Sequence, residues 1–145
     1  MSKVNISSDE LTPTTTFDPD TLANPINPDW FRGVHEARLA KEVGIDQFGV
    51  NKVTLDPGSY SALRHWHEGE DEFILILNGE LTLIEDTGEH VLHQGSTVGF
   101  PAGVPNAHHL ANRSAYPATY LAVGTRLPAK DVIHYPDNNL KPVTR

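Results

Sequence analysis

The feature that most constrains the fold is a two-residue alternation of apolar and polar side chains that begins near residue 47. It recurs in short segments, about 8 to 12 residues apart, as far as residue 126, with turn-forming residues between them. This period places successive side chains on opposite faces of a β-strand. Many short strands joined by tight turns are typical of a sandwich or barrel. We therefore predict an all-β chain.

The predicted strands can be given by their residue ranges. The pair Asn78-Gly79 is a strong signal for a two-residue hairpin turn, so the strands on its two sides are expected to pair with each other. Pro57-Gly58 and residues 86–89 are further turn signals. The segments read as strands are 48–56, 59–67, 72–86 (two strands), 90–95, 96–103, 107–114 and 118–126.

The chain of 145 residues has the length of one domain. Residues 1–46 are expected to form an extended N-terminal arm, with one short helical turn within 36–44. For about the first 30 residues, a disordered tail is an equal alternative. The β-barrel is expected over 47–126, and the Pro-rich residues 127–145 form a C-terminal extension.

Composition excludes several classes of partner and site. The net charge is −8 and the Lys and Arg residues are scattered, which argues against binding to nucleic acid or to anionic membranes. No cysteine is present, so a disulfide or thiolate site is impossible, and a reducing compartment suits the chain. The N-terminus lacks an apolar signal segment, and the longest apolar run, 73–77, is too short to cross a membrane. The expected location is the cytoplasm.

A histidine-carboxylate pattern lies inside the predicted strands. His65 and His67 occupy alternate positions and therefore point to one face. Residues 68–71 are expected to turn, after which Glu72 opens the next strand and can face both histidines. Two imidazoles and one carboxylate suit a divalent transition metal ion such as Zn, Mn, Fe, Ni or Cu. Locally hydrogen-bonded surface histidines are the ordinary alternative.

A further ligand is expected from the segment 107–114. His108 and His109 lie on opposite faces of this predicted strand, so one of them, but not both, can point inward. Leu110 shares its face with His108 and continues the apolar side, which favours His108 as the inward residue.

Two motifs resemble those of the cupin superfamily. The first is matched by Gly58, His65, His67, Glu72 and Gly79, with one extra residue between Gly58 and His65. The second is matched by Gly95, Pro101, Gly103, His108 and Asn112, with two extra residues between Gly103 and His108. Without that insertion Asn106 would occupy the histidine position, but only His108 keeps the spacing to Asn112. The stretch over 47–126 is similar to small single-domain bacterial cupins.

The resemblance implies a double-stranded β-helix, or jelly-roll barrel, that binds one metal ion per chain. The ligands that it implies are His65, His67, Glu72 and His108. It also implies a homodimer, often with terminal arms that cross to the partner.

Two functions remain open. The first is a mononuclear metalloenzyme, of dioxygenase, isomerase, lyase or cyclase type, acting on a small oxygenated molecule. The second is a non-catalytic module that binds or senses a small ligand. The sequence does not reveal a general base, and for an anionic substrate it offers only Arg113 and Lys52 as possible anchors.

Overall fold

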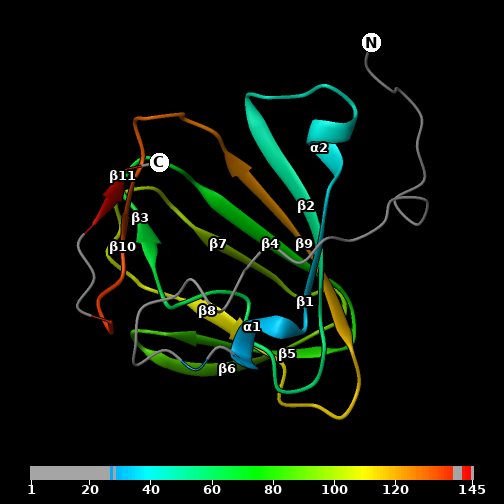
Figure 1. The fold of residues 1–145 in the computed structure, drawn as a ribbon. Helices are drawn as coiled ribbons and strands as arrows, with labels where there is room; N and C mark the ends of the chain where they lie inside the picture. The colour runs from blue at the N-terminus through cyan, green and yellow to red at the C-terminus, as the bar shows by residue number, and fades with distance from the viewer. Residues whose placement is uncertain (1–26, 28, 139–141, 145) are drawn as a thin grey trace.

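The structure is a computed structural model that describes residues 27, 29–138 and 142–144 (Figure 1). Its strands are β1 Val34–Arg38, β2 Phe48–Leu55, β3 Trp66–His67, β4 Glu72–Asn78, β5 Glu80–Glu85, β6 Gly88–His93, β7 Thr97–Phe100, β8 His109–Ala111, β9 Ala118–Thr125, β10 Val132–His134 and β11 Val143–Thr144. Two single-turn helices, α1 Asp29–Arg32 and α2 Leu39–Glu42, accompany them. No helix in these described ranges has the length and apolar character needed to cross a membrane.

The strands form antiparallel sheets that build a β-barrel. The largest sheet has the order β1-β2-β9-β4-β7, and a second has the order β6-β5-β8. A small third sheet, β11-β10-β3, lies at one side of the molecule (Figure 1). The prediction of an all-β barrel is thus confirmed.

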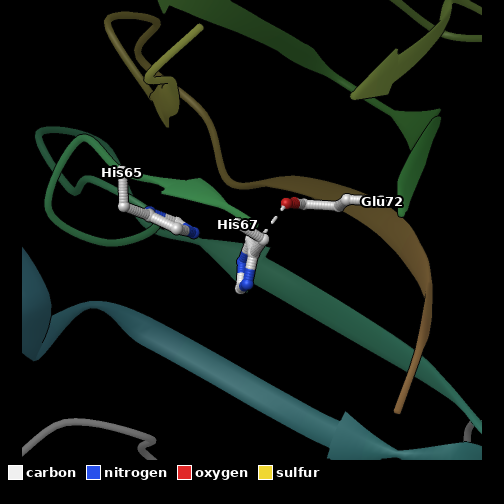
Figure 2. Close-up of side chains that lie close together, drawn as sticks. All are labelled: His65, His67 and Glu72. Atoms are coloured by element: carbon white, nitrogen blue, oxygen red, sulfur yellow. Dashed lines mark ion pairs between the residues drawn. The ribbon is translucent and has the colours of Figure 1, made fainter. Parts of the chain in front are cut away.

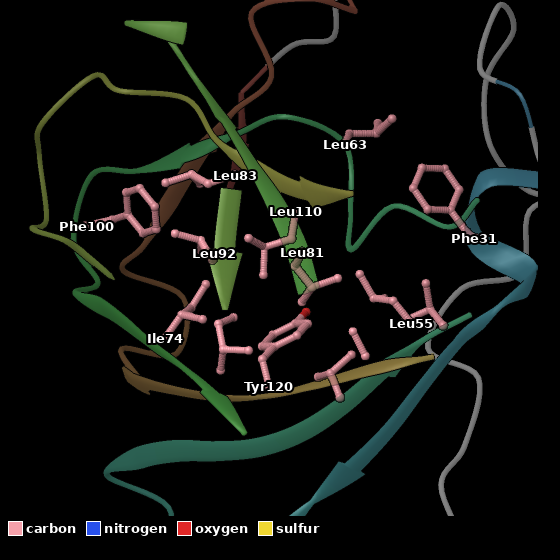
Figure 3. Packing of buried hydrophobic residues seen from close by; sticks show 14 residues of the cluster. Phe31, Leu55, Leu63, Ile74, Leu81, Leu83, Leu92, Phe100, Leu110 and Tyr120 are labelled. Carbon is pink, nitrogen blue, oxygen red and sulfur yellow. The ribbon is translucent and has the colours of Figure 1, made fainter. Parts of the chain in front are cut away.

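The hydrophobic core lies between the two larger sheets (Figure 3). Alternation along the strands turns one face of each sheet inward, where its aliphatic side chains pack against those of the other sheet. The large sheet contributes Val53, Leu55, Ile74, Ile76 and Tyr120, and the second sheet contributes Leu81, Leu83, Leu92 and Leu110. This packing fixes the positions of the strands that carry the candidate site.

The predicted hairpin at Asn78-Gly79 is wrong, although both flanking strands exist. β4 pairs with β7 and β9, whereas β5 pairs with β6 and β8. The turn therefore carries the chain from one sheet to the other. Gly79 has a φ of +80°, and a Cβ atom there would lie 2.7 Å from the Cβ of Ala118. Asn78-Gly79 correctly predicted a turn. The close approach of Ala118 could not be predicted from the residues around the turn, because Ala118 is distant in the sequence.

Part of the segment expected to be an N-terminal arm belongs to the large sheet. β1 pairs with β2 from Val34 opposite Leu55 to Arg38 opposite Asn51. The short helical turn expected within 36–44 is present as α2. Of the expected arm, residues 1–26 and 28 lie outside the described residues.

The predicted strand over 59–67 is mostly irregular, and only β3 has strand geometry. Isolated bridges join Tyr60 to Ala111 and His65 to His108. On its other side β3 pairs with β10, which belongs to the expected C-terminal extension. The extension therefore contributes a strand beside one of the candidate ligands, His67.

Candidate metal centre

The structure brings together His65, His67 and Glu72. His65 precedes β3, His67 lies in β3, and Glu72 opens β4 after the intervening turn. One ligand atom from each of the three side chains lies within 4.8 Å of the other two. Figure 2 shows the carboxylate of Glu72 directed toward His67, with Nε2 of His67 and Oε2 of Glu72 4.0 Å apart.

His108 joins this cluster from the neighbouring segment. Its side chain is buried, and its Nε2 lies 3.0 Å from Oε2 of Glu72. The ring stacks on Phe100 with centroids 3.4 Å apart. His109 points elsewhere, because its Nδ1 contacts the carbonyl oxygen of Ala62. His108 therefore points inward, as predicted from the apolar side that it shares with Leu110.

Asn106, the alternative at this position, is directed away from the cluster. Its Nδ2 donates to Oε2 of Glu85 at 3.0 Å, and its Oδ1 accepts from the N–H of Asp86 at 3.1 Å. Both groups of its amide are thus engaged outside the cluster. Of the two alternatives, the structure places His108 beside Glu72.

All three histidines have Nδ1 held by an acceptor. A carbonyl oxygen only accepts, so Nδ1 of His65 and of His108 must carry the hydrogen. Each neutral ring then presents an Nε2 lone pair, which is the form that binds metals. The Nδ1 contacts are 2.7 Å from His65 to O of Leu63, 3.0 Å from His108 to O of Asn106, and 2.6 Å from His67 to Oδ2 of Asp131.

The cluster consequently brings Nε2 lone pairs of the histidines close to the carboxylate of Glu72. Burial favours a raised pKa for Glu72, but an Nε2–H of His108 when that ring is protonated, together with the positive charges of the protonated neighbouring imidazoles, outweighs it and lowers the pKa to about 2. Burial is the main reason that the pKa of His65 falls to about 4. An ionised carboxylate facing imidazole lone pairs requires a cation, either a proton or a metal ion. The donor set therefore fits a divalent transition metal.

A cavity of about 280 Å³ opens beside the cluster and is lined by His65, His67 and Glu72. Its remaining wall comes largely from the inner face of the large sheet, where alternate residues of neighbouring strands meet. These wall residues are Val34, Glu36 and Arg38 of β1, Asn51 and Val53 of β2, and Tyr120, Ala122 and Gly124 of β9. The cavity thus places additional carboxylate, phenol and guanidinium groups beside the candidate ligands.

Two arginines line both this cavity and an adjoining one of about 340 Å³. Arg126 extends its guanidinium over Gly49, where a Cβ atom would lie 2.2 Å from Nη2 of the arginine. Its Nη1 lies 3.8 Å from Oε1 of Glu70. Nε of Arg38 lies 3.3 Å from Oε1 of Glu36. The absence of a side chain at residue 49 is what leaves room for Arg126.

The anion anchors considered from the sequence do not line this cavity. Arg113 instead pairs with Glu89 at 2.9 Å, on the outside of the barrel. Lys52 is also missing from the cavity wall. The expectation of an extended arm over 1–46 gives no reason to place Glu36 and Arg38 at a cavity. Their two-residue spacing after Val34 was the available signal, since it places all three on one face.

Comparisons with known proteins identify the family of this fold. The family model described as Cupin_2, Cupin domain, matches residues 51–124. No curated protein matches the chain.

Several solved structures are similar over most of their length. A sugar phosphate isomerase of the cupin superfamily from Silicibacter pomeroyi is 39% identical, with a TM-score of 0.72, and the match covers 83% of this chain and 80% of that one. A protein assigned as a sugar phosphate isomerase from Acidithiobacillus ferrooxidans is 29% identical, with a TM-score of 0.75 and coverage of 82% and 73%. A predicted oxalate decarboxylase from Thermotoga maritima is 26% identical, with a TM-score of 0.64 and coverage of 86% and 100%. The chain therefore belongs to the cupin superfamily.

Proposed function

We propose that this protein is a metal-dependent isomerase that acts on a phosphorylated sugar. The observation that carries the proposal is the acceptor cluster at a cavity whose wall also holds two arginines. Two of the similar solved structures are sugar phosphate isomerases by name, one of them 39% identical to this chain. A metal site suits the sugar carbonyl, and guanidinium groups in the same cavity suit the phosphate.

The proposed ligands are His65, His67, Glu72 and His108, which would hold one Zn, Mn, Fe, Ni or Cu ion. When bound, the ion supplies Lewis-acid polarisation of a carbonyl oxygen of the substrate. Because these four side chains serve as ligands, the groups that move protons must come from elsewhere in the cavity.

Glu36 is the proposed general base. An aldose–ketose interconversion moves one proton between adjacent carbons and one between their oxygens, with no change in composition. The Glu36 carboxylate can take the proton from one carbon and return it to the neighbouring carbon. It lines the cavity from β1 and is separate from the four proposed ligands.

Tyr120 is the proposed hydrogen-bond donor to a substrate oxygen. Burial, followed by the negative charges of Glu72 and Glu36, raises the pKa of this phenol far above its ordinary value. The hydroxyl therefore stays protonated and can donate to a substrate oxygen. Its hydroxyl lies in the field of both carboxylates, and its side chain lines the same cavity.

Arg38 and Arg126 are proposed to bind the phosphate group. A guanidinium offers several N–H donors in a planar array that suits phosphate oxygens. The two arginines line both adjoining cavities. If the phosphate bound between them, the sugar carbons would extend into the first cavity, toward the proposed metal ligands.

The test is isomerisation of aldose and ketose phosphates by protein that has been stripped of metal and then reloaded with each candidate ion. In D₂O, proton NMR would show the product and the deuterium incorporated at carbon. We expect turnover only after reloading, and none with the His67→Ala variant. Saturable ligand binding without turnover would instead favour the non-catalytic binding module.

A further inference from the structure

Asp131 is a buried carboxylate that contacts the segment carrying His67. Its side chain has no exposure to solvent. Oδ2 lies 2.6 Å from Nδ1 of His67, and Oδ1 accepts a hydrogen bond of 2.9 Å from the N–H of Gly69. A buried carboxylate is costly unless such donors satisfy it. Both of its oxygens are therefore tied to the same short segment, which fixes the carboxylate against the imidazole.

Strand pairing holds Asp131 in this place. It immediately precedes β10, in which His134 lies opposite Trp66 of β3. The rings of these two residues stack with centroids 4.1 Å apart. The N–H of Glu68 donates to the carbonyl oxygen of Val132 at 2.9 Å. The contact with His67 is thus part of a paired and stacked segment.

The partner of His67 differs in kind from those of the other two histidines. His65 and His108 donate through Nδ1 to backbone carbonyl oxygens, whereas His67 faces a carboxylate. A carboxylate partner holds the hydrogen on Nδ1, fixes the ring orientation and makes Nε2 a stronger donor to a metal. Nε2 is the atom of His67 that faces Glu72.

The side chains around Asp131 are already engaged in other contacts, which argues against a second metal site there. His67, Glu70 and Asp131 lie close enough to be considered as one. However, Oε2 of Glu70 already accepts from the N–H of Leu127 at 2.9 Å, and Oε1 lies 3.8 Å from Arg126. Nδ1 of His67 is occupied by Asp131. The carboxylates therefore support the surrounding structure and His67.

We propose that Asp131 is a positioning residue that orients His67 for metal binding, so that the C-terminal segment controls the metal affinity of the site. Asp131 lies outside residues 51–124, the part matched by the family model. The inference rests on the metal site of the proposed function and is independent of the substrate.

The test compares Asp131→Asn with the unmodified protein. Asparagine has nearly the same size, but its amide has one accepting oxygen, whereas both His67 and Gly69 require an acceptor. Competition with a chromophoric chelator would measure Co²⁺ affinity, which we expect to fall ~10–100-fold. Long-range ¹H–¹⁵N NMR of metal-free protein should show His67 as the Nδ1–H tautomer, and a shift away from that form in Asp131→Asn.

Asp137→Asn is the matched control, because Asp137 belongs to the same C-terminal segment but binds Arg64, with Oδ2 2.7 Å from Nε. It should leave Co²⁺ affinity and the His67 tautomer unchanged. Unchanged affinity in Asp131→Asn, or an equal loss in Asp137→Asn, would overturn the proposal. An Nε2–H tautomer of His67 in the unmodified protein would also overturn it, even if the variant did not fold. If the unmodified protein bound no Co²⁺, the proposed function would fail, while the tautomer would still report whether Asp131 orients His67.

Discussion

Oε2 of Glu72 and Nε2 of His108 lie 3.0 Å apart, although the ring of His108 already donates through Nδ1 to a backbone carbonyl oxygen. In the neutral ring both atoms of the short contact are acceptors. A proton or a metal ion must therefore lie between them.

His108→Ala is expected to remove the bound metal, and His109→Ala to leave it in place. His108 faces Glu72, whereas His109 binds the carbonyl oxygen of Ala62. If His108 is a direct ligand, its loss should reduce metal affinity by at least the ~10–100-fold typical of an outer partner. Elemental analysis of the purified variants measures this. Equal metal content in the two variants would remove His108 from the proposed ligands.

Metal removal should lower the melting temperature. An ion that binds only the folded chain stabilises it by ~2.7 kcal/mol when its concentration is 100 times the dissociation constant. For a chain of this length, that corresponds to roughly 5–10 °C. Calorimetry before and after chelation, with metal content checked in parallel, provides the measurement. The His67→Ala variant should show no such difference.

The metal-free protein is expected to lose stability as the pH falls below 6.5, the ordinary pKa of His65, because that pKa is about 4 in the folded chain. Between these values the unfolded chain binds a proton at His65 that the folded chain does not bind. The free energy of unfolding therefore decreases as pH falls, by at most ~1.4 kcal/mol per pH unit. The lowered pKa of Glu72 acts in the same direction at lower pH.

Urea denaturation of chelator-treated protein across this pH range measures the effect. The His65→Gln variant should show a weaker dependence on pH, because glutamine does not titrate. An identical slope in the variant and the unmodified protein would contradict the low pKa of His65.

Glu36→Gln is expected to abolish isomerisation without loss of metal. The substitution removes the proposed base, which is worth ~10²–10⁴-fold in rate, and leaves the four proposed ligands intact. Glu80→Gln, at an exposed position of β5, is the control. Steady-state kinetics should show a fall in kcat in Glu36→Gln only. Unimpaired turnover would assign proton transfer to another group.

Gly49→Ala should weaken recognition of the phosphate. The new methyl group would lie 2.2 Å from Nη2 of Arg126, so the flexible guanidinium must move. Gly99→Ala is a matched control in β7, where the nearest atom is 4.0 Å from the added Cβ. We expect a higher KM for a sugar phosphate in Gly49→Ala and little change in Gly99→Ala. Equal KM values for both variants would argue against Arg126 as a phosphate ligand.

The sequence by itself determined the β class and the main candidate residues. Alternation from residue 47 onward depends on local side-chain patterns, so β2, β4, β5, β6, β7, β8 and β9 could be anticipated. The spacing of His65, His67 and Glu72 likewise requires only a strand followed by a turn. The two faces of the predicted strand allow only one of His108 and His109 to point inward, and Leu110 on the apolar face favours His108.

Tertiary structure decided which strands pair and what surrounds the cluster. The turn at Gly79 is local, but it joins two sheets rather than closing a hairpin because β4 pairs with β7 and β9, whereas β5 pairs with β6 and β8. Glu36 and Arg38 reach the cavity only because β1 pairs with β2, and Asp131 reaches His67 only because β10 pairs with β3. Such pairings depend on free energies summed over residues far apart in the chain, and no short segment encodes them.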